Sequence, residues 1–183
     1  MTKPNFFILC PPKCASTSIW KFLVDHPDVF LPTEKEPHFF SQGFEHFPKK
    51  YHSLEEYLSL FRGGAQFQLI GEASTAYFSD ADAPQRIYEA IGPAKFIVCL
   101  RNPVERLISH LNYAIQFGHT RKQVRYFFDH PEGFVGFKYS FYSEPLKRYF
   151  DMFGQSNFLV LSFNDVVSDF QKAMNEICAF LNI

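Results

Sequence analysis

The sequence lacks the features that mark several classes of protein. No apolar run approaches the ~18 residues of a membrane span, and the short run near the N-terminus is too brief for a signal peptide. The chain has only 4 cysteines, with no Cys-x-x-Cys pair, and its net charge is −1. Nucleic-acid-binding domains held by bulk electrostatics are usually strongly basic. We therefore expect no membrane span, no nucleic-acid partner, reduced cysteines and a cytoplasmic location.

Apolar surface, in contrast, is abundant. Hydrophobic residues make up 46% of the 183 residues, and 24 of them are phenylalanine. A chain of this size and composition can bury a core without disulfides, and disorder is excluded. We expect a single domain over residues 1–183.

Short apolar runs alternate with helical patterns along the chain. Four runs predict buried strands, at residues 6–10, 67–70, 95–100 and 158–162. Apolar residues at helical spacing lie between or after them, at residues 16–25, 54–61, 104–115 and 174–181. Residues 117–139 show no clean period and are expected to form a long loop. The alternation predicts a three-layer, P-loop-like α/β fold with a central parallel β-sheet flanked by helices.

The loop after the first predicted strand combines a lysine with three hydroxyl residues. It reads Pro-Pro-Lys13-Cys14-Ala15-Ser16-Thr17-Ser18 and leads into a helix. Unpaired N–H groups at a helix N-terminus attract anions, so this loop can hold a phosphate-like group. A helix capped by Ser or Thr beside a solvated lysine is the alternative. The loop contains no glycine and so fails the nucleotide P-loop pattern.

A second loop with positive charge follows the third predicted strand. Arg101 stands at the strand end, and Asn102 and Pro103 are a suitable N-cap and first residue for the helix that carries Ser109. Parallel strands end at one sheet edge, so Arg101 and Lys13 are expected to share it, and ligands bind there in such sheets. Two anion-binding loops predict a ligand with two separated anionic groups.

Each of these residues also has a structural interpretation. Arg101 can form an ion pair with a nearby carboxylate, and the Ser109 hydroxyl can bond to its own helix backbone. For Arg106 we weigh a helix-surface ion pair against contact with the ligand.

Together these motifs resemble those of the sulfotransferases that use 3′-phosphoadenosine 5′-phosphosulfate (PAPS), particularly the bacterial and heparan-sulfate-type branch. The resemblance extends in order from the first loop to the end of the chain. It is carried by the lysine loop, by a Lys-Glu-Pro-His-Phe-Phe hexad, by a Gly-Glu-Ala-Ser-Thr-Ala-Tyr-Phe block and by an Arg-Asn-Pro-x-x-Arg-x-x-Ser motif, at residues 13–19, 35–40, 71–78 and 101–109.

This resemblance implies an enzyme that moves a sulfuryl group in line from PAPS to a hydroxyl or amine and releases 3′,5′-bisphosphoadenosine (PAP), with no metal. The acceptor would be a small molecule or a carbohydrate. Glu36 is implied as the general base, with His38 as the competing candidate. In the implied PAPS site, Lys13 contacts the leaving phosphate and the first loop holds the 5′-phosphosulfate. Arg101 and Ser109 bind the 3′-phosphate. The full set of implied PAPS-binding residues is Lys13, Cys14, Ala15, Ser16, Thr17, Ser18, Arg101 and Ser109.

Departures from the family pattern limit what can be carried over. Ala15 stands where the family usually has glycine, so we expect the loop to manage without a positive φ there. Ala73 replaces a lysine of several carbohydrate-acting relatives. The family's usual segment after residue 183, which contacts the adenosine and 3′-phosphate, is expected to be absent. Glu72 is interpreted either as orienting the acceptor or as pairing with Arg62 or Arg86.

Two other functions compete with this interpretation. A non-catalytic module of the same fold would bind a nucleotide or a partner protein without transferring a group. A small P-loop kinase is disfavoured, because the glycine motif is missing and because arginine stands where an acidic residue would hold Mg²⁺.

Overall fold

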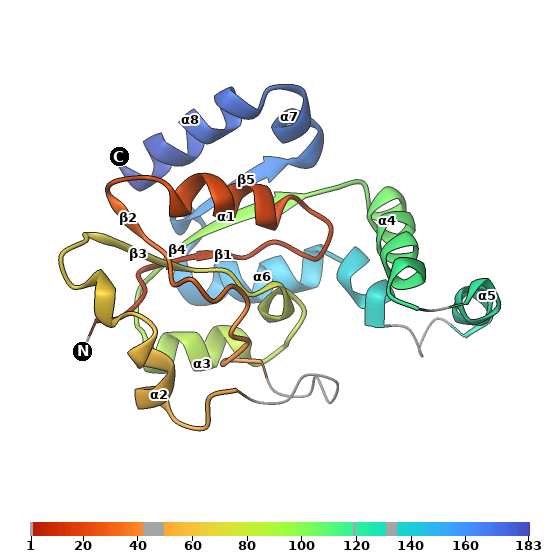
Figure 1. The fold of residues 1–183 in the computed structure, drawn as a ribbon, viewed down its shortest axis with the longest axis horizontal. Coiled ribbons are helices and arrows are strands. Elements are labelled where there is room, and N and C mark those ends of the chain that lie inside the picture. The colour runs from red at the N-terminus through yellow and green to blue at the C-terminus, as the bar shows by residue number, and fades with distance from the viewer. Residues whose placement is uncertain (1, 42–49, 119, 131–134) are drawn as a thin grey trace.

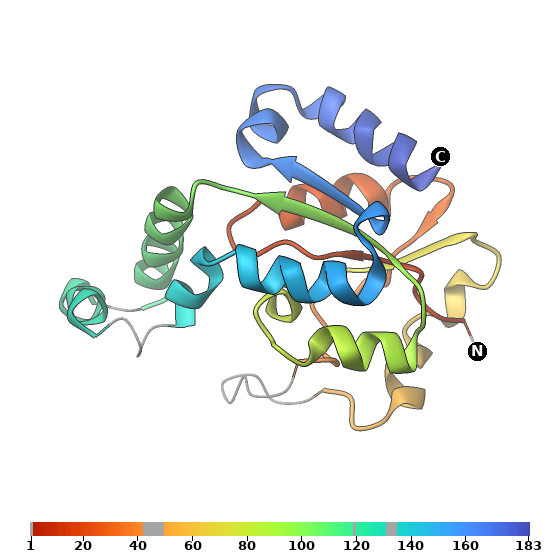
Figure 2. The same ribbon diagram turned by 180° about the vertical axis from the view of Figure 1, so that it is seen from behind.

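The computed structural model describes residues 2–41, 50–118, 120–130 and 135–183. Five parallel strands form one sheet in the order β2-β3-β1-β4-β5, with helices on both faces (Figures 1 and 2). The predicted three-layer α/β fold is therefore confirmed. The strands are β1 (Phe6–Ile8), β2 (Val29–Phe30), β3 (Leu69–Glu72), β4 (Lys95–Leu100) and β5 (Phe158–Ser162).

The strand predictions differ in accuracy. β4 and β5 have the predicted bounds, β1 is two residues shorter than predicted, and β3 begins two residues later and reaches Glu72. β2 was not predicted, because a strand of two residues carries no recognisable period. Gly71 of β3 pairs with Phe6 of β1, and a Cβ atom there would lie 2.2 Å from the Phe6 ring. Glycine thus allows these two central strands to approach each other.

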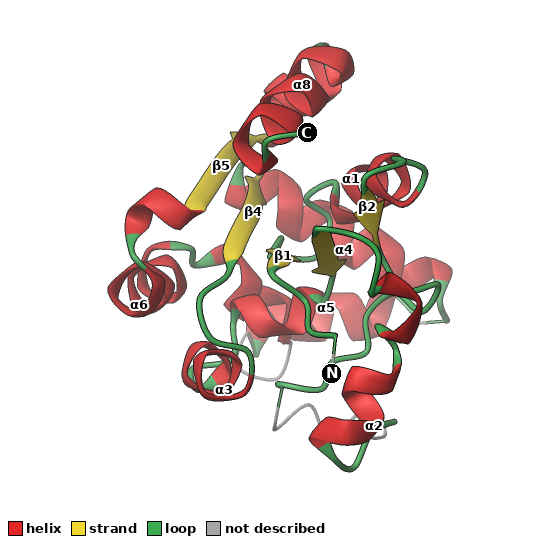
Figure 3. Cartoon of the chain, turned by 90° about the vertical axis from the view of Figure 1, so that its left-hand side faces the viewer, coloured by secondary structure: helices red, strands yellow, loops and turns green. Residues whose placement is uncertain are grey.

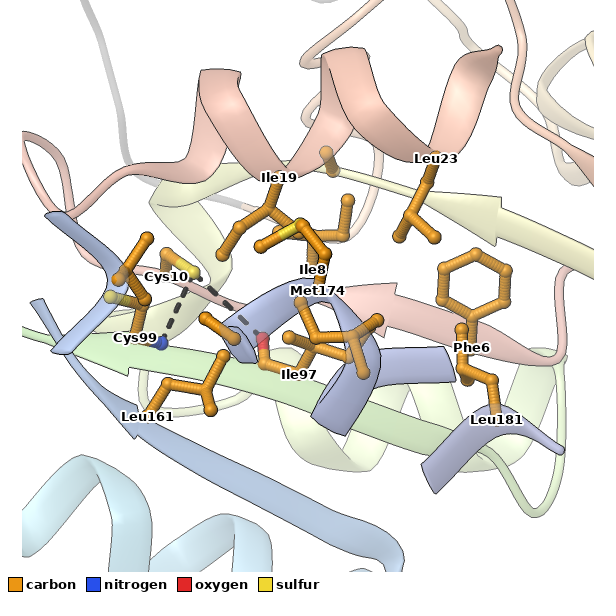
Figure 4. Packing of buried hydrophobic residues seen from close by; sticks show 14 of the residues in the cluster. Phe6, Ile8, Cys10, Ile19, Leu23, Ile97, Cys99, Leu161, Met174 and Leu181 are labelled. Carbon is orange, nitrogen blue, oxygen red and sulfur yellow. Dashed lines mark hydrogen bonds between the residues drawn. The ribbon is translucent and has the colours of Figure 1, made fainter. Parts of the chain in front are cut away.

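Alternate residues of the strands point into two cores. Phe6 and Ile8 face α1 (Ser16–Val24) and α8 (Phe170–Leu181), whereas Phe7 faces the opposite side of the sheet. Figure 3 shows the strands between these two layers of helices. The first core also holds Cys10, whose Sγ accepts a hydrogen bond from the backbone N of Cys99 at 3.2 Å (Figure 4). The remaining layer helices are α7 (Phe163–Ser168) on the first side and α2 (Leu54–Ser59), α3 (Ala83–Ala90) and α6 (Ser143–Phe153) on the second.

Short 3₁₀ turns connect these elements. Within the described residues they are η1 (Arg62–Gly64), η2 (Thr75–Phe78), η4 (Val135–Ser140) and η5 (Gln155–Asn157). No helix within the described ranges is long and apolar enough to cross a membrane.

The helix α4 (Pro103–Gln116) extends away from the carboxyl end of β4, and α5 (Arg121–Asp129) lies beyond it (Figure 1). The start of α4 is as predicted, since the Asn102 side chain accepts the N–H groups of residues 104 and 105. Its apolar stripe is buried only in part: Leu111 is buried, but Val104 and Ile108 are 64% and 52% exposed, and Arg106 is buried instead. The reason is that α4 packs against η4 and α5 rather than lying flat on the sheet.

The expectation of a long loop over residues 117–139 is also wrong. The segment contains α5 and part of η4, and residues 119 and 131–134 lie outside the described residues. A capping box starts α5, because Thr120 Oγ1 accepts the N–H of Gln123 at 3.2 Å and Gln123 Oε1 accepts the N–H of Thr120 at 2.7 Å. This Thr-x-x-Gln pattern was the available signal.

Candidate functional site

The loop between β1 and α1 turns sharply with two residues of left-handed backbone. Lys13 has φ 70° and Ala15 has φ 61°, so the expectation that Ala15 avoids a positive φ is wrong. The turn must reverse the chain from the sheet edge into α1 while Cys14 stays buried beneath it. Such bends direct successive N–H groups to one side, an arrangement that favours anions.

The first turn of α1 leaves its N–H groups available. Its N-cap is Ala15, which within the described residues makes no side-chain capping bond. The Ser16 side chain is buried, whereas Thr17 and Ser18 are exposed. The backbone donors at this helix start form an anion-attracting feature, and the exposed Thr17 and Ser18 hydroxyls belong to the same turn.

Arg101 leaves the end of β4 and lies over the ring of Phe163, with 4.3 Å from its guanidinium carbon to the ring centre. Its Nε is 3.4 Å from Oε2 of Glu105, so the ion pair weighed above is present. That carboxylate is mostly exposed, and exposed pairs contribute little. The aromatic contact and the pair together orient Arg101 without consuming its outer nitrogens.

One pocket lies between the two predicted loops. Of the first loop only Lys13 lines it, and the predicted donor-binding residues 14–18, which the structure describes, do not. Lys13, Arg101 and Ser109 line a cavity of about 360 Å³, so the predicted shared edge is observed. Lys13 Nζ sits 4.4 Å from the ring centre of Tyr113, in cation–π range. Five further α4 residues complete the lining: Glu105, Ile108, Asn112, Tyr113 and Gln116. Sequence reasoning missed the last three, although they follow Ser109 at helical spacing.

Arg106 is neither a surface residue nor exposed to the pocket. Its buried guanidinium donates to Ser140 Oγ at 3.0 Å and to the Gly136 carbonyl, tying α4 to η4. It also contacts Nδ1 of His110 at 3.2 Å. Burial, together with the charges of Arg106 and Lys13, lowers the pKa of His110 to about 4, so this imidazole is neutral at pH 7. The charged side chains that line the pocket itself are Lys13, Arg101 and Glu105.

The segment with Glu36 and His38 crosses the end of β3, next to β1 in the sheet. The backbone N of Glu36 donates to the Ala73 carbonyl at 2.9 Å, and that of His38 donates to Ser74 Oγ at 3.0 Å. Because β3 pairs with β1 in the parallel sheet, this segment lies at the same carboxyl edge as the loop that carries Lys13.

Three groups hold the Glu36 carboxylate. Lys35 Nζ lies 2.6 Å from Oε1, while His38 Nε2 and Thr75 Oγ1 lie 3.2 Å and 3.0 Å from Oε2. Burial opposes the charged form, but the hydrogen bonds and charges of His38 and Lys35 outweigh it and lower the pKa of Glu36 to about 2. The Glu36 side chain is 31% exposed against 16% for His38, and Nε2 of His38 is directed at Glu36. Glu36 is thus the more accessible candidate base.

Glu72 forms neither of the predicted arginine pairs among the described residues, and its role toward an acceptor stays a prediction. Its buried carboxylate accepts a hydrogen bond from the Tyr57 hydroxyl at 2.9 Å, and the hydroxyls of Ser74 and Tyr77 also favour its charged form. Burial raises the pKa of Glu72 to about 7. Arg86 pairs instead with Asp80 and Asp82.

Comparisons with known proteins agree with this geometry. The sulfotransferase domain model matches residues 3–183. The chain belongs to the sulfotransferase domain family. A bacterial sulfotransferase structure from Alicyclobacillus acidocaldarius is 29% identical, with a TM-score of 0.86, and the match covers 100% of this chain and 82% of that one.

Curated sulfotransferases are also similar in sequence. Human heparan sulfate glucosamine 3-O-sulfotransferase 6 is 30% identical over 188 residues, which cover 98% of this chain and 52% of the relative. The membrane-associated sulfotransferase kil1 of Dictyostelium discoideum is 31% identical over 133 residues, or 69% and 27% of the two chains. The chain thus spans about half or less of these relatives' length. The expected cytoplasmic location is wrong by this comparison, because a similar sulfotransferase is membrane-associated.

Proposed function

We propose that the chain transfers a sulfuryl group from PAPS to a hydroxyl or amine acceptor and releases PAP. The observation that carries the proposal is that Lys13, Arg101 and Ser109 line one pocket. Two cations on separate loops suit a ligand with two separated anionic groups. The pocket volume of about 360 Å³ lies at the lower end of the range for small-molecule sites.

The donor side uses the positive groups of this pocket. Lys13 neutralises charge that develops on the 5′-phosphate oxygen as it leaves, and the first N–H groups of α1, from Ser16 on, hold the phosphosulfate. Arg101 and Ser109 hold the 3′-phosphate. The Tyr113 ring and the Phe163 ring support the two cationic side chains at their present positions. No step of the proposal needs a metal ion.

Glu36 is the proposed general base, and the donor supplies only an activated sulfuryl group. The acceptor oxygen bonds to sulfur as the bond from sulfur to the phosphate oxygen breaks, and the acceptor proton passes to Glu36. A carboxylate with a pKa of about 2 is ionised at pH 7 and ready to accept a proton. It is a weak base, so positioning and charge stabilisation contribute most of the rate. His38 and Lys35 keep Glu36 ionised and oriented.

The proposed acceptor is a carbohydrate or another small molecule with a hydroxyl or amine. Support comes from relatives whose names specify heparan sulfate and carbohydrate substrates. Ala73 departs from the lysine of several carbohydrate-acting relatives, so both acceptor classes belong in the assay.

A ligand-linked thermal shift tests the donor half of the proposal. PAP should raise the melting temperature more than AMP or ATP at equal concentration, because stabilisation scales with RT ln(1 + [L]/Kd). PAP release from PAPS, measured with heparan sulfate and with 4-nitrophenol as acceptors, tests transfer. Equal stabilisation by the three nucleotides would reject the bisphosphate site, and PAP binding without any transfer would identify a non-catalytic module.

A further inference from the structure

Three backbone N–H groups of the segment that carries Glu36 and His38 donate hydrogen bonds to the residues that follow β3. The acceptors are a carbonyl, a serine hydroxyl and a tyrosine hydroxyl, all from buried residues. The three bonds are Glu36 N to Ala73 O at 2.9 Å, His38 N to Ser74 Oγ at 3.0 Å and Phe40 N to Tyr77 Oη at 3.2 Å.

These three hydrogen bonds stabilise a backbone conformation that is otherwise unfavourable. Glu36 has φ 63° and His38 has φ 53°, both in the left-handed region that non-glycine residues rarely adopt. Such conformations persist only where the surrounding structure fixes them, and they concentrate at functional sites. The Ser74 hydroxyl fixes the bend at His38, and Ser74 is only 2% exposed.

Thr75 acts on the carboxylate of the same segment. Its Oγ1 donates to Oε2 of Glu36 at 3.0 Å, the oxygen that also faces His38 Nε2. Lys35 occupies the other oxygen, at 2.6 Å. With donors on both oxygens from different directions, the carboxylate has one orientation, and Thr75 is the neutral member of the set.

We propose that Ser74 and Thr75 are positioning residues for sulfuryl transfer, Ser74 by holding the bend at His38 and Thr75 by orienting the Glu36 carboxylate. The proposal rests on the role of Glu36 as the base. Neither residue lines the pocket that holds Lys13 and Arg101. Their loss should therefore lower turnover and leave the affinity for PAP unchanged.

The test compares Ser74→Ala and Thr75→Val with wild type, using PAPS with heparan sulfate and with 4-nitrophenol. A displacement of about 1 Å in a reacting group lowers a rate by about 100-fold, so a loss of about 10- to 100-fold in kcat is expected for each variant. The Kd for PAP should stay within about twofold of wild type. Neither side chain lines the pocket of Lys13 and Arg101, and sites that share no partners are energetically almost independent. Thr75→Ser keeps the hydroxyl and should restore kcat.

Ser53→Ala is the matched control. Ser53 Oγ likewise accepts a backbone N–H, from Glu56 at 3.1 Å, but at the start of α2. This variant should keep the wild-type kcat. Wild-type kcat in Ser74→Ala and Thr75→Val, failure of Thr75→Ser to rescue, or PAP affinity that falls in step with kcat would each overturn the proposal.

Amide hydrogen exchange gives a readout that does not depend on activity. The His38 amide should exchange faster in Ser74→Ala than in wild type, and at the wild-type rate in Ser53→Ala. If the wild-type chain transfers no sulfuryl group, the proposed function fails. Unchanged exchange of the His38 amide in Ser74→Ala would separately refute the hydrogen bond from His38 to Ser74 as the stabilising contact. Faster exchange would support that contact in either case.

Discussion

The buried carboxyl of Glu72 should make the stability of the fold depend on pH near neutrality. Burial raises its pKa from 4.5 to about 7 in the folded chain. The folded state therefore binds more protons than the unfolded state between these values, so stability falls as pH rises through this range. This difference in pKa corresponds to about 3 kcal/mol of folding stability, which is present below pH 4.5 and lost above pH 7.

Glu72→Gln removes this dependence because an amide does not ionise. The amide can still accept the Tyr57 hydroxyl, and its buried NH₂ group adds a cost that is the same at every pH. Between pH 5 and pH 8, the free energy of unfolding of the variant should rise by about 3 kcal/mol relative to that of wild type. For a chain of this length that equals about 6–12 °C in melting temperature.

Urea denaturation at pH 5, 6, 7 and 8 measures the difference directly. Glu55→Gln, on the exposed side of α2, is the control and should follow the wild-type curve. Tyr57→Phe removes a hydrogen bond that favours the ionised form, so the loss of stability should extend to higher pH. Parallel stability curves for wild type and Glu72→Gln would refute the reasoning, since they would mean that Glu72 titrates alike in both states.

Three further predictions concern the site. Lys13→Ala should lower PAP release from PAPS by more than tenfold while the melting temperature stays near wild type; unchanged turnover would remove Lys13 from the mechanism. Arg101→Ala should weaken PAP binding by about 10- to 100-fold, the effect of a lost charged hydrogen bond, and AMP binding far less; calorimetry showing equal losses would contradict a 3′-phosphate clamp. Lys35→Met should raise the pKa of Glu36 from about 2 toward the ordinary 4.5, so turnover relative to wild type should fall at pH 4 and recover by pH 7; a pH-independent ratio would show that Lys35 does not control this carboxyl.

Several features of the fold follow from the sequence because they depend on local pattern. The apolar runs over β4 and β5 predicted both strands with their bounds, and Asn102 and Pro103 predicted the start of α4. Parallel strands place their carboxyl ends at one edge, so two loops 88 positions apart in the chain were expected to meet. The shared pocket of Lys13 and Arg101 is the outcome.

Tertiary contacts decided the rest. The period of α4 predicted a helix, but contact with η4 determined which face is buried, and it buried Arg106 and left Val104 exposed. The positive φ of Ala15 depends on the path from the sheet edge into α1, which no local preference of alanine indicates.

The contacts around Glu36 were likewise decided by the tertiary structure. Sequence indicated Glu36 by family resemblance, but the hydroxyl that orients it comes from Thr75, 39 residues away. A motif specifies residue types along one stretch of chain. The orientation and pKa of a side chain depend on charges, donors and burial contributed by distant segments, and these are known only once the strands have paired.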